Sequence, residues 1–556
     1  MRRPSAHFDS IRDRRALAWI VLLAIPTALP VLNILLSWWQ PASDTWAHLR
    51  AELLLEYVVN TVLLIGLVAA GVLLVGVSTA WWTATREFPG RRVLAWCLLL
   101  PIAAPAYVVA YAYADLLAFD GTFAQWLRVI GGAQVPLPPM RSMGGAAFVL
   151  IFTLYPYVFL FAYTAFRSQS RTLGEAARAL GARPLRAWWR VSLPHARPAI
   201  LGGLVLALME TAADFGVVDF YGVPTLTNGI FRTWFAQGDQ TAALQLAAWL
   251  FVVVLTLVVF ERLSRRGQHA NPVSRQSTRA RRPVSGLRAW WMTLACAVPV
   301  LFGFVIPMVL FTKYGLEVGD PMLGRSFSRF VLGTVKVASL AAVFTVIGAL
   351  ALTVLQRRAT GGGRPSLAIA LPVQLATLGY AVPGLVLAVG FLGPLTALDR
   401  SLAGGLAGVM SPPPGLLLTG SVAALVIAYF VRFLTVAYQS CDSAMAQIHP
   451  NFDAAGRSLG QGSRALFRRV HVPLMTPAIA TAFLLVFVDV VKELPATLVL
   501  RPFNFETLAT RAYRLASDER IAEASTAALA MAITGLIPAL LLGWQRFAAR
   551  AAQDSS

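Results

Sequence analysis

Residues 175–200 read EAARALGARPLRAWWRVSLPHARPAI, and residues 454–479 read AAGRSLGQGSRALFRRVHVPLMTPAI. The two stretches align on Gly181 and Gly460, which lie about half of the 556-residue chain apart. Pro194 and Pro473, and Pro198 and Pro477, keep this separation, as do two pairs of acidic residues further on. A repeat with this period indicates that the chain consists of two similar halves.

The composition excludes a disordered chain and argues against a soluble globular protein. Hydrophobic residues make up 57% of the chain and charged residues 13%, whereas about a quarter of a typical soluble domain is charged. The mean hydropathy is +0.66, which is typical of a polytopic membrane protein. The net charge is +21, and nearly all of the basic residues are arginines. In a membrane protein this excess indicates cytoplasmic loops and anionic lipid, so we expect membrane lipid and no nucleic acid as partners.

Twelve apolar runs are long enough to cross a bilayer core of about 30 Å as helices, which takes roughly 20 residues each. Backbone polar groups in lipid must bond within their own segment, and the alternation of a barrel is absent, so we expect an all-α fold. The twelve expected transmembrane helices lie at 17–39, 57–83, 93–118, 145–166, 198–220, 242–261, 289–312, 331–355, 366–394, 416–438, 477–500 and 524–545.

The distribution of arginine predicts the topology. With a cytoplasmic N-terminus, most Lys and Arg residues fall in cytoplasmic segments, so we expect both termini to be cytoplasmic. Six helices then form a first half at 1–263, and six form a second half at 288–556. An Arg-rich cytoplasmic linker at 264–287 joins them. Both repeated loops, 167–197 and 439–476, are cytoplasmic, so the repeat is parallel and a pathway would lie between the halves.

The first repeated loop has the pattern of two short helices joined at a glycine. Residues 175–177 fit a short helix, and Gly181 permits the left-handed backbone that ends one. Trp188 and Trp189 then supply an apolar face for a second helix. One interpretation is an amphipathic helix pair on the membrane surface; the other is a docking surface. Repetition of the loop ahead of equivalent spans favours docking.

The spacing E-A-A-x3-G-x9-V-x-L-P in this loop resembles the EAA loop of ABC-transporter permeases of the binding-protein-dependent importer class. In that family each loop forms a coupling helix that docks in a groove of a cytoplasmic ATPase subunit. The resemblance implies a fused double permease in the inner (plasma) membrane of a bacterium, with two ATPase subunits and an external substrate-binding protein. It implies these docking residues: Glu175, Ala176, Ala177, Gly181, Leu193, Pro194, Asp453, Ala454, Ala455, Gly460, Val472 and Pro473.

The second loop departs from the family pattern. Ala454-Ala455-Gly456 stands where Glu-Ala-Ala is expected, and Asp453 lies one residue early. Val472-Pro473 stands in place of Leu-Pro. We therefore expect the second loop to keep its shape and to lose or replace the glutamate contact.

The chain lacks the motifs of an enzyme. No G-x-x-x-x-G-K-[ST] loop occurs in it, so ATP and Mg²⁺ are expected on the partner subunits, with no cofactor in this chain. The six histidines are dispersed, and the three cysteines lack metal-ligand spacing, so we expect no metal site. A membrane-embedded enzyme would need a catalytic cluster, and the sequence contains none that we recognise.

Resemblance also suggests the cargo. The stretch VDVVKELPATLVLRPFNFETLATRAYRLASDER, residues 488–520, resembles the permeases of ferric-iron importers. We therefore expect an ATP-driven ferric-iron importer, whose external binding protein selects the cargo. Thiamine or a phosphonate is the alternative cargo for the same machinery. A different class of protein, a secondary transporter driven by an ion gradient, stays open because the spans hold carboxylates.

These carboxylates are costly in lipid and are therefore candidates for a pathway or gate at the interface of the halves. A structural pairing of Lys492 with Asp489 or another carboxylate is the alternative, and direct cation binding is a third. The candidates are Glu210, Asp214, Asp489, Lys492 and Glu493. In the external segments, four arginines are candidates for meeting the binding protein: Arg232, Arg501, Arg511 and Arg514.

Overall fold

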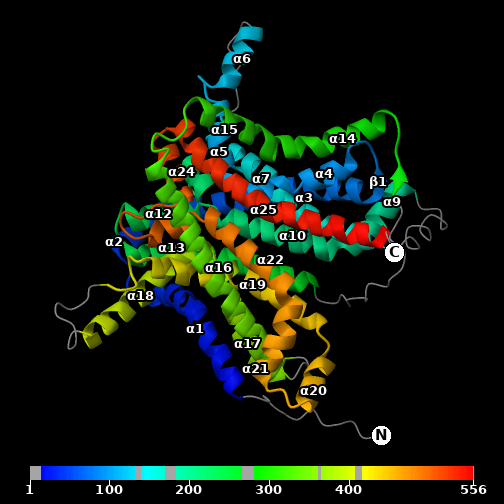
Figure 1. Ribbon diagram of the computed structural model, residues 1–556. Helices are drawn as coiled ribbons and strands as arrows, with labels where there is room; N and C mark the ends of the chain where they lie inside the picture. Colours follow the sequence, from blue (N-terminus) through cyan, green and yellow to red (C-terminus); the bar gives the residue numbers. More distant parts are fainter. Residues whose placement is uncertain are drawn as a thin grey trace. The chain divides into compact units, whose positions relative to one another are not determined.

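The computed structural model describes residues 14–131, 139–169, 183–265, 281–360, 365–406 and 416–554. Most of these residues are helical (Figure 1), which confirms the prediction of a polytopic all-α protein. Within the described ranges one strand pair occurs: β1 (Arg86–Glu87) pairs in parallel with β2 (Arg282–Pro283). Helices satisfy backbone hydrogen bonds internally, as a chain in lipid requires.

The described residues include ten helices long and apolar enough to cross a membrane, or eleven if one bent pair counts as a span. The twelve expected spans are therefore not reproduced one for one. At 93–118 the helical path bends by 93°, because Pro101 and Pro105 lack the backbone N–H that a continuous helix needs. This region consists of α4 (Arg91–Cys97), η3 (Leu100–Ala103) and α5 (Ala106–Leu116).

The expected span at 366–394 also differs from the structure. It is divided, and its last part starts directly after Pro383. Its pieces are α17 (Leu367–Ala376), η6 (Gly379–Ala381) and α18 (Gly384–Leu406). The expected span at 524–545 lies within a single helix, α25 (Ile521–Asp554).

The chain forms two compact units, of which unit 1 comprises Met1–Pro41, Ala243–Ala248 and Ser328–Thr510. Its first helix, α1 (Arg14–Leu36), packs against α17 and α18 (Figure 1). Thr27 of α1 donates a hydrogen bond to the carbonyl oxygen of Ala376 at 3.2 Å, and Asn33 donates to that of Gly390 at 3.0 Å. The other helices are η1 (Ser37–Trp39), α16 (Arg325–Thr360, entering from unit 2), α19 (Val422–Gln447), α20 (Pro450–Ser458), α21 (Ser463–Leu466), η7 (Phe467–His471), α22 (Val472–Lys492) and α23 (Pro495–Leu500).

Unit 2 comprises Ala42–Ala242, Trp249–Phe327 and Arg511–Ser556. Its centre is the packing of α3 (Leu54–Thr85), α7 (Met143–Ser168) and α10 (Leu193–Ala213) on one another. Gly203 permits close approach of α10 to α7, because a Cβ there would lie 2.7 Å from the carbonyl oxygen of Tyr157. The other helices are α2 (Asp44–His48), η2 (Leu49–Leu53), α4, η3, α5, α6 (Thr122–Gly131), α9 (Pro184–Ala187), η4 (Trp188–Ser192), α11 (Gly216–Phe220), α12 (Leu226–Phe235), α13 (Gln240–Arg265, partly in unit 1), α14 (Leu287–Val300), η5 (Leu301–Val305), α15 (Ile306–Glu317), α24 (Leu508–Ser517, entering from unit 1) and α25.

The elements that follow the two repeated loops correspond one to one. α9 and α21, η4 and η7, and α10 and α22 begin and end at the same separation as Gly181 and Gly460. Each compact unit nevertheless includes helices from both parts of the sequence, since α1 lies in unit 1 and α14 in unit 2. The division into halves at 1–263 and 288–556 with a linker at 264–287 stays a prediction.

Candidate functional site

The first repeated loop is described from Arg183 onward. Glu175, Ala176, Ala177 and Gly181 lie outside the described residues. Ser192, at the end of η4, is buried, and its carbonyl oxygen accepts a hydrogen bond of 2.7 Å from Gln169, the residue after α7. Trp188 contacts Trp81 of α3 edge to face, with ring centroids 6.2 Å apart, whereas Trp189 is 59% exposed. The base of the loop is thus anchored and leaves one large aromatic ring exposed.

Both loops enter their next helix through a π-helical turn, η4 in the first loop and η7 in the second. Leu193-Pro194 follows η4, and Val472-Pro473 follows η7. Proline lacks a backbone N–H, and a wider turn before it accommodates the missing donor. In each loop the aliphatic residue is half-buried and the proline is exposed, so these predicted docking residues share one environment.

The second loop is described throughout. Its short helix α20 carries Ala454 and Ala455, both exposed, and is followed by Gly460 with a φ of 73°. This left-handed conformation suits glycine and ends the helix. Phe452 and Leu459 expose 53% and 78% of their surface.

Asp453 is directed into the protein. Its Oδ2 atom accepts a hydrogen bond of 2.8 Å from Arg357 Nε, and its Oδ1 atom lies 2.7 Å from His471 Nε2. Arg357 also donates to the carbonyl oxygens of Met445 and Ile448, at 2.8 and 2.9 Å. Burial alone would raise the pKa of Asp453, but the hydrogen bonds and charges of Arg357 and His471 hold it below its usual value. The acid of the second loop therefore ties α20 to the end of α16 and the start of α22.

The expected continuous span at 198–220 is wrong at Asp214, where α10 has ended. The Oδ1 atom of Asp214 accepts backbone hydrogen bonds from Val217 at 3.0 Å and Val218 at 3.3 Å. A carboxylate in this position satisfies the free N–H groups at the start of the short helix α11. Asp214 is thus a helix cap at a break between two helices.

Glu493 occupies the corresponding break, so the expected span at 477–500 is also interrupted. α22 ends at Lys492, and Glu493 Oε1 accepts a hydrogen bond of 3.2 Å from the backbone N–H of Ala496 in α23. Unlike Asp214, Glu493 also forms an ion pair: its Oε2 atom lies 3.3 Å from Arg432 Nε of α19, with both side chains buried. Gly384 lies against this pair, and any Cβ there would collide with it.

Comparison with known proteins shows which transport proteins this chain resembles. The family described as the binding-protein-dependent transport system inner membrane component matches residues 72–265, which include the first loop and the helices on both sides of it. Over 94% of its length, the chain is 26% identical to the Fe(3+)-transport system permease protein FbpB 2 of Haemophilus influenzae, and it covers 96% of that protein. The chain is a permease subunit of a binding-protein-dependent ABC importer. It is therefore a transport subunit of an inner membrane and not an enzyme, and its partners include a binding protein and an ATPase.

The permease also has shorter matches. It is 30% identical to the sulfate transport system permease protein CysT of Salmonella typhimurium, over 26% of this chain and 50% of that protein. It is 29% identical to the putative 2-aminoethylphosphonate transport system permease protein PhnU of Salmonella choleraesuis, over 36% of this chain and 71% of that protein.

The remaining candidates for a gate are Glu210, Asp489 and Lys492. Glu210 lies half-buried one turn before the end of α10. In α22, Lys492 Nζ lies 3.5 Å from Asp489 Oδ1, on the preceding turn. This distance favours the structural pairing of Lys492 with Asp489 over a role of either residue as a free charge.

The four arginines expected in external segments differ in what they contact. Arg511 is 3% exposed and forms a two-pronged ion pair with Asp320, at 3.0 and 2.9 Å, so it is a wrong choice for a contact with the binding protein. Arg501 forms an ion pair with Glu506, with 3.7 Å between Nη1 of the arginine and Oε1 of the glutamate. Arg232 and Arg514 have exposed side chains and stay candidates.

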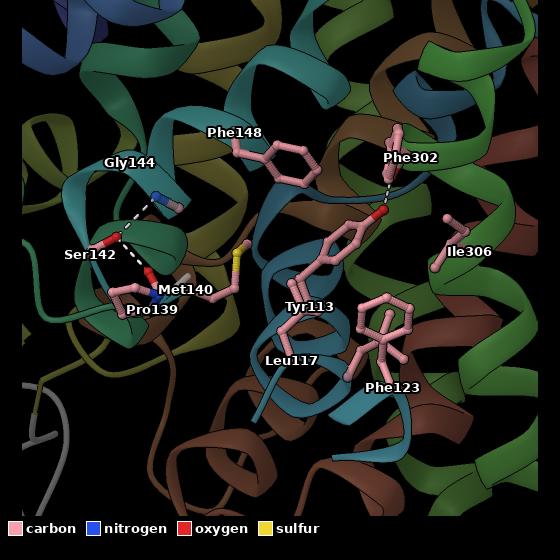
Figure 2. A pocket seen from close by; sticks show the side chains of 12 residues that line it. Tyr113, Leu117, Phe123, Pro139, Met140, Ser142, Gly144, Phe148, Phe302 and Ile306 are labelled. Atoms are coloured by element: carbon pink, nitrogen blue, oxygen red, sulfur yellow. Dashed lines mark hydrogen bonds between the residues drawn. The ribbon is translucent and has the colours of Figure 1, made fainter. Parts of the chain in front are cut away.

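Unit 2 of the permease contains an apolar cavity of about 650 Å³ (Figure 2). The ring of Tyr113 lies among Phe123, Phe148 and Phe302, and its hydroxyl donates a hydrogen bond of 2.7 Å to the Phe302 carbonyl oxygen. Such a lining offers nothing to replace the water around an ion, so the cavity is unsuited to a charged cargo. Within the described ranges, no group of three or more His, Cys, Asp or Glu residues could hold a metal ion.

Proposed function

We propose that this permease forms the membrane pathway of a ferric-iron importer, driven by two cytoplasmic ATPase subunits. The observation that supports this best is the similarity to an Fe(3+)-transport permease along 94% of the chain. The matches to the sulfate and phosphonate permeases cover 26% and 36% of the chain. Both termini are cytoplasmic in this proposal, and the external binding protein selects the iron.

Each repeated loop docks one ATPase subunit. Support comes from the one-to-one correspondence of α9, η4 and α10 with α21, η7 and α22, because equivalent elements can present equivalent surfaces. The exposed side chains Trp189 in the first loop, and Phe452 and Leu459 in the second, are large and apolar. Exposed apolar groups in a cytoplasmic loop are typical of a protein interface.

The two docking loops differ in how they use their acid. In the first, Glu175 contacts the ATPase, with Ala176, Ala177 and Gly181 allowing close approach and Leu193 and Pro194 forming the base. In the second, Asp453 holds α20 in place through Arg357 and His471. Docking there relies on shape and on residues around the exposed Ala454, Ala455 and Gly460, with Val472 and Pro473 at the base.

The breaks at Asp214 and Glu493 act as hinges for the gate. At both places a carboxylate caps a short helix that follows a long one, so the two helices are joined without a continuous backbone ladder. ATP-driven closure of the ATPase subunits would move the two loops together and open the pathway outward. Glu210, Asp489 and Lys492 line or brace this path.

Uptake of radiolabelled ferric iron in cells with and without this permease tests the cargo. Loss of iron uptake alone supports the proposal, with thiamine and a phosphonate as controls. Unchanged iron uptake with loss of thiamine or phosphonate uptake would show that the importer carries that other cargo and would leave the ATP-driven mechanism in place. Iron uptake that continues when the ATPase subunit is inactive would instead favour a secondary transporter.

A further inference from the structure

The short strands β1 and β2 bring two arginine-rich segments together in unit 2. Arg86 is paired with Arg282 and Glu87 with Pro283, and the backbone N–H of Val284 donates to the Glu87 carbonyl oxygen at 2.9 Å. β1 follows α3, and β2 precedes α14. The pairing therefore fixes basic residues at the ends of two membrane helices that are far apart in the sequence.

One carboxylate in this cluster, that of Glu87, lies close to two guanidinium groups. Glu87 Oε2 lies 3.0 Å from Arg91 Nε and 3.9 Å from Arg281 Nη1. Burial, and then the charges of Arg167 and Arg91, lower the pKa of Arg281, against the opposing effect of Tyr163. The Nε atom of Arg281 is buried and has no hydrogen-bond partner among the described residues. The cluster thus has more positive charge than Glu87 can neutralise.

Large apolar side chains lie beside the cluster at the start of α14. Leu287 is 86% exposed, and Trp290 and Trp291 are each 64% exposed. Thr293 of α14 donates a hydrogen bond of 2.9 Å to the carbonyl oxygen of Pro89, two residues after β1, so the start of this helix lies against the segment that joins β1 to α4. Exposed tryptophans next to arginines at a helix end are typical of the membrane–water interface.

We propose that this cluster binds the phosphate of an anionic phospholipid in the cytoplasmic leaflet, with the acyl chains along Trp290 and Trp291. The leaflet rests on the cytoplasmic placement of both termini proposed above. Guanidinium groups pair well with phosphate oxygens, and basic pockets at the cytoplasmic ends of helices suit lipid headgroups. Free phosphate shares the headgroup chemistry but would leave the apolar side chains without a partner, so the lipid fits more of the observations.

Native mass spectrometry of the purified permease in detergent can measure the affinity for added lipid. The probes are phosphatidylglycerol, phosphatidylcholine with the same acyl chains, and inorganic phosphate as a competitor. We expect phosphatidylglycerol to bind more tightly than phosphatidylcholine, and phosphate at millimolar concentration not to displace it. Equal binding of the two lipids would overturn the proposal. Displacement by phosphate would overturn the lipid as the source of the phosphate group.

Three variants test the residues. Arg281→Gln should weaken phosphatidylglycerol binding about fivefold, which corresponds to the roughly 1 kcal/mol of one basic residue near a membrane surface. Glu87→Gln should strengthen it by a similar factor, because it removes the charge that competes with the phosphate. Trp290→Ala is at an exposed position, so it should fold normally and still weaken lipid binding. Arg400→Gln, an exposed arginine of unit 1, is the matched control and should have no effect.

The sign of the Glu87→Gln effect decides between a binding site and a structural network. A network of ion pairs that holds β1 and β2 together would be weakened by Glu87→Gln, and lipid binding would fall or stay the same. Either result would contradict the proposal, as would unchanged binding in both Arg281→Gln and Trp290→Ala.

Discussion

Asp453 and His471 lie 2.7 Å apart, from carboxylate Oδ1 to imidazole Nε2, and this contact joins the short helix of the second repeated loop to the start of α22. Arg357 completes the group from the end of α16. Counting back by the repeat separation from Asp453 and His471 leads to Gly174 and Ser192, which cannot form such a pair. The two loops of the permease therefore have similar elements after the glycine but different internal supports.

Asp453→Asn should loosen the second loop, because it removes the charge that Arg357 and His471 share. Loss of a hydrogen-bond partner with charged groups costs roughly 1–3 kcal/mol. We expect faster proteolysis within 448–471 and a lower Tm, while Asp518→Asn, at an exposed position, leaves both unchanged. Equal proteolysis of the Asp453 variant and the unmodified permease would contradict this role.

The same contact predicts a pH dependence. The pKa of Asp453 is lower in the folded permease than in the unfolded chain, where it is about 3.9. The contribution of this group to stability is therefore complete above that value and is lost as the pH falls through the lower, folded-state pKa. Proteolysis of 448–471 should increase below about pH 4 in the unmodified permease, and the Asp453→Asn variant should lack this increase.

Docking of the ATPase should depend more on the first loop than on Asp453. Glu175→Arg or Gly181→Val should abolish co-purification of the ATPase subunit while membrane insertion continues. The first replaces the carboxylate that contacts the ATPase with a positive charge. The second adds a branched side chain where the loop and the ATPase approach closely. Asp453→Asn should reduce co-purification only in part. Normal co-purification in both first-loop variants would contradict the assignment of this loop.

Gly384→Ala should disrupt the second hinge. A methyl group there would collide with Arg432 and Glu493, which form a buried ion pair at 3.3 Å. We expect a large fall in Tm and in transport. Gly405→Ala on the same helix is the control, since a Cβ at Gly405 meets no atom within 4 Å, and an exposed helical glycine gains up to about 1 kcal/mol on change to alanine. Equal stability of the two variants would contradict the packing described for Gly384.

The two helix caps should respond differently to neutralisation. Asn caps a helix about as well as Asp, so Asp214→Asn should change stability by less than about 1 kcal/mol. Glu493→Gln leaves Arg432 buried without its carboxylate, and breaking a buried pair costs roughly 3–5 kcal/mol. Thermal unfolding of the two variants in the same detergent checks this. A larger effect at Asp214 than at Glu493 would contradict the asymmetry.

The sequence predicts the helical fold and the repeat well, and the contacts that support the loops poorly. Hydropathy identifies most of the membrane helices, because apolar length alone determines them. It does not reveal the breaks at Asp214 and Glu493, which lie among apolar residues, although Gly216 and Pro495 directly afterwards are signals of an interrupted helix.

The ion-pair partners of two arginines could not be predicted from the local sequence pattern. Arg357 reaches Asp453 and Arg432 reaches Glu493 across long stretches of sequence, and only the folded packing of α16, α19 and α22 brings them together. For Arg511 the sequence leads to a wrong prediction of exposure. Its place in a polar external segment suggests exposure, yet Asp320 pairs with it in a buried position.

The central claim is that this chain carries ferric iron across the membrane with ATP as the energy source. The most direct measurement is accumulation of radiolabelled ferric iron in proteoliposomes that contain the permease and its ATPase subunits, with iron-loaded binding protein outside and ATP enclosed. We predict accumulation that needs ATP and the binding protein and is lost in Gly181→Val. Accumulation driven by an ion gradient without ATP, or no accumulation of iron by a complex that hydrolyses ATP in response to another cargo, would contradict the account.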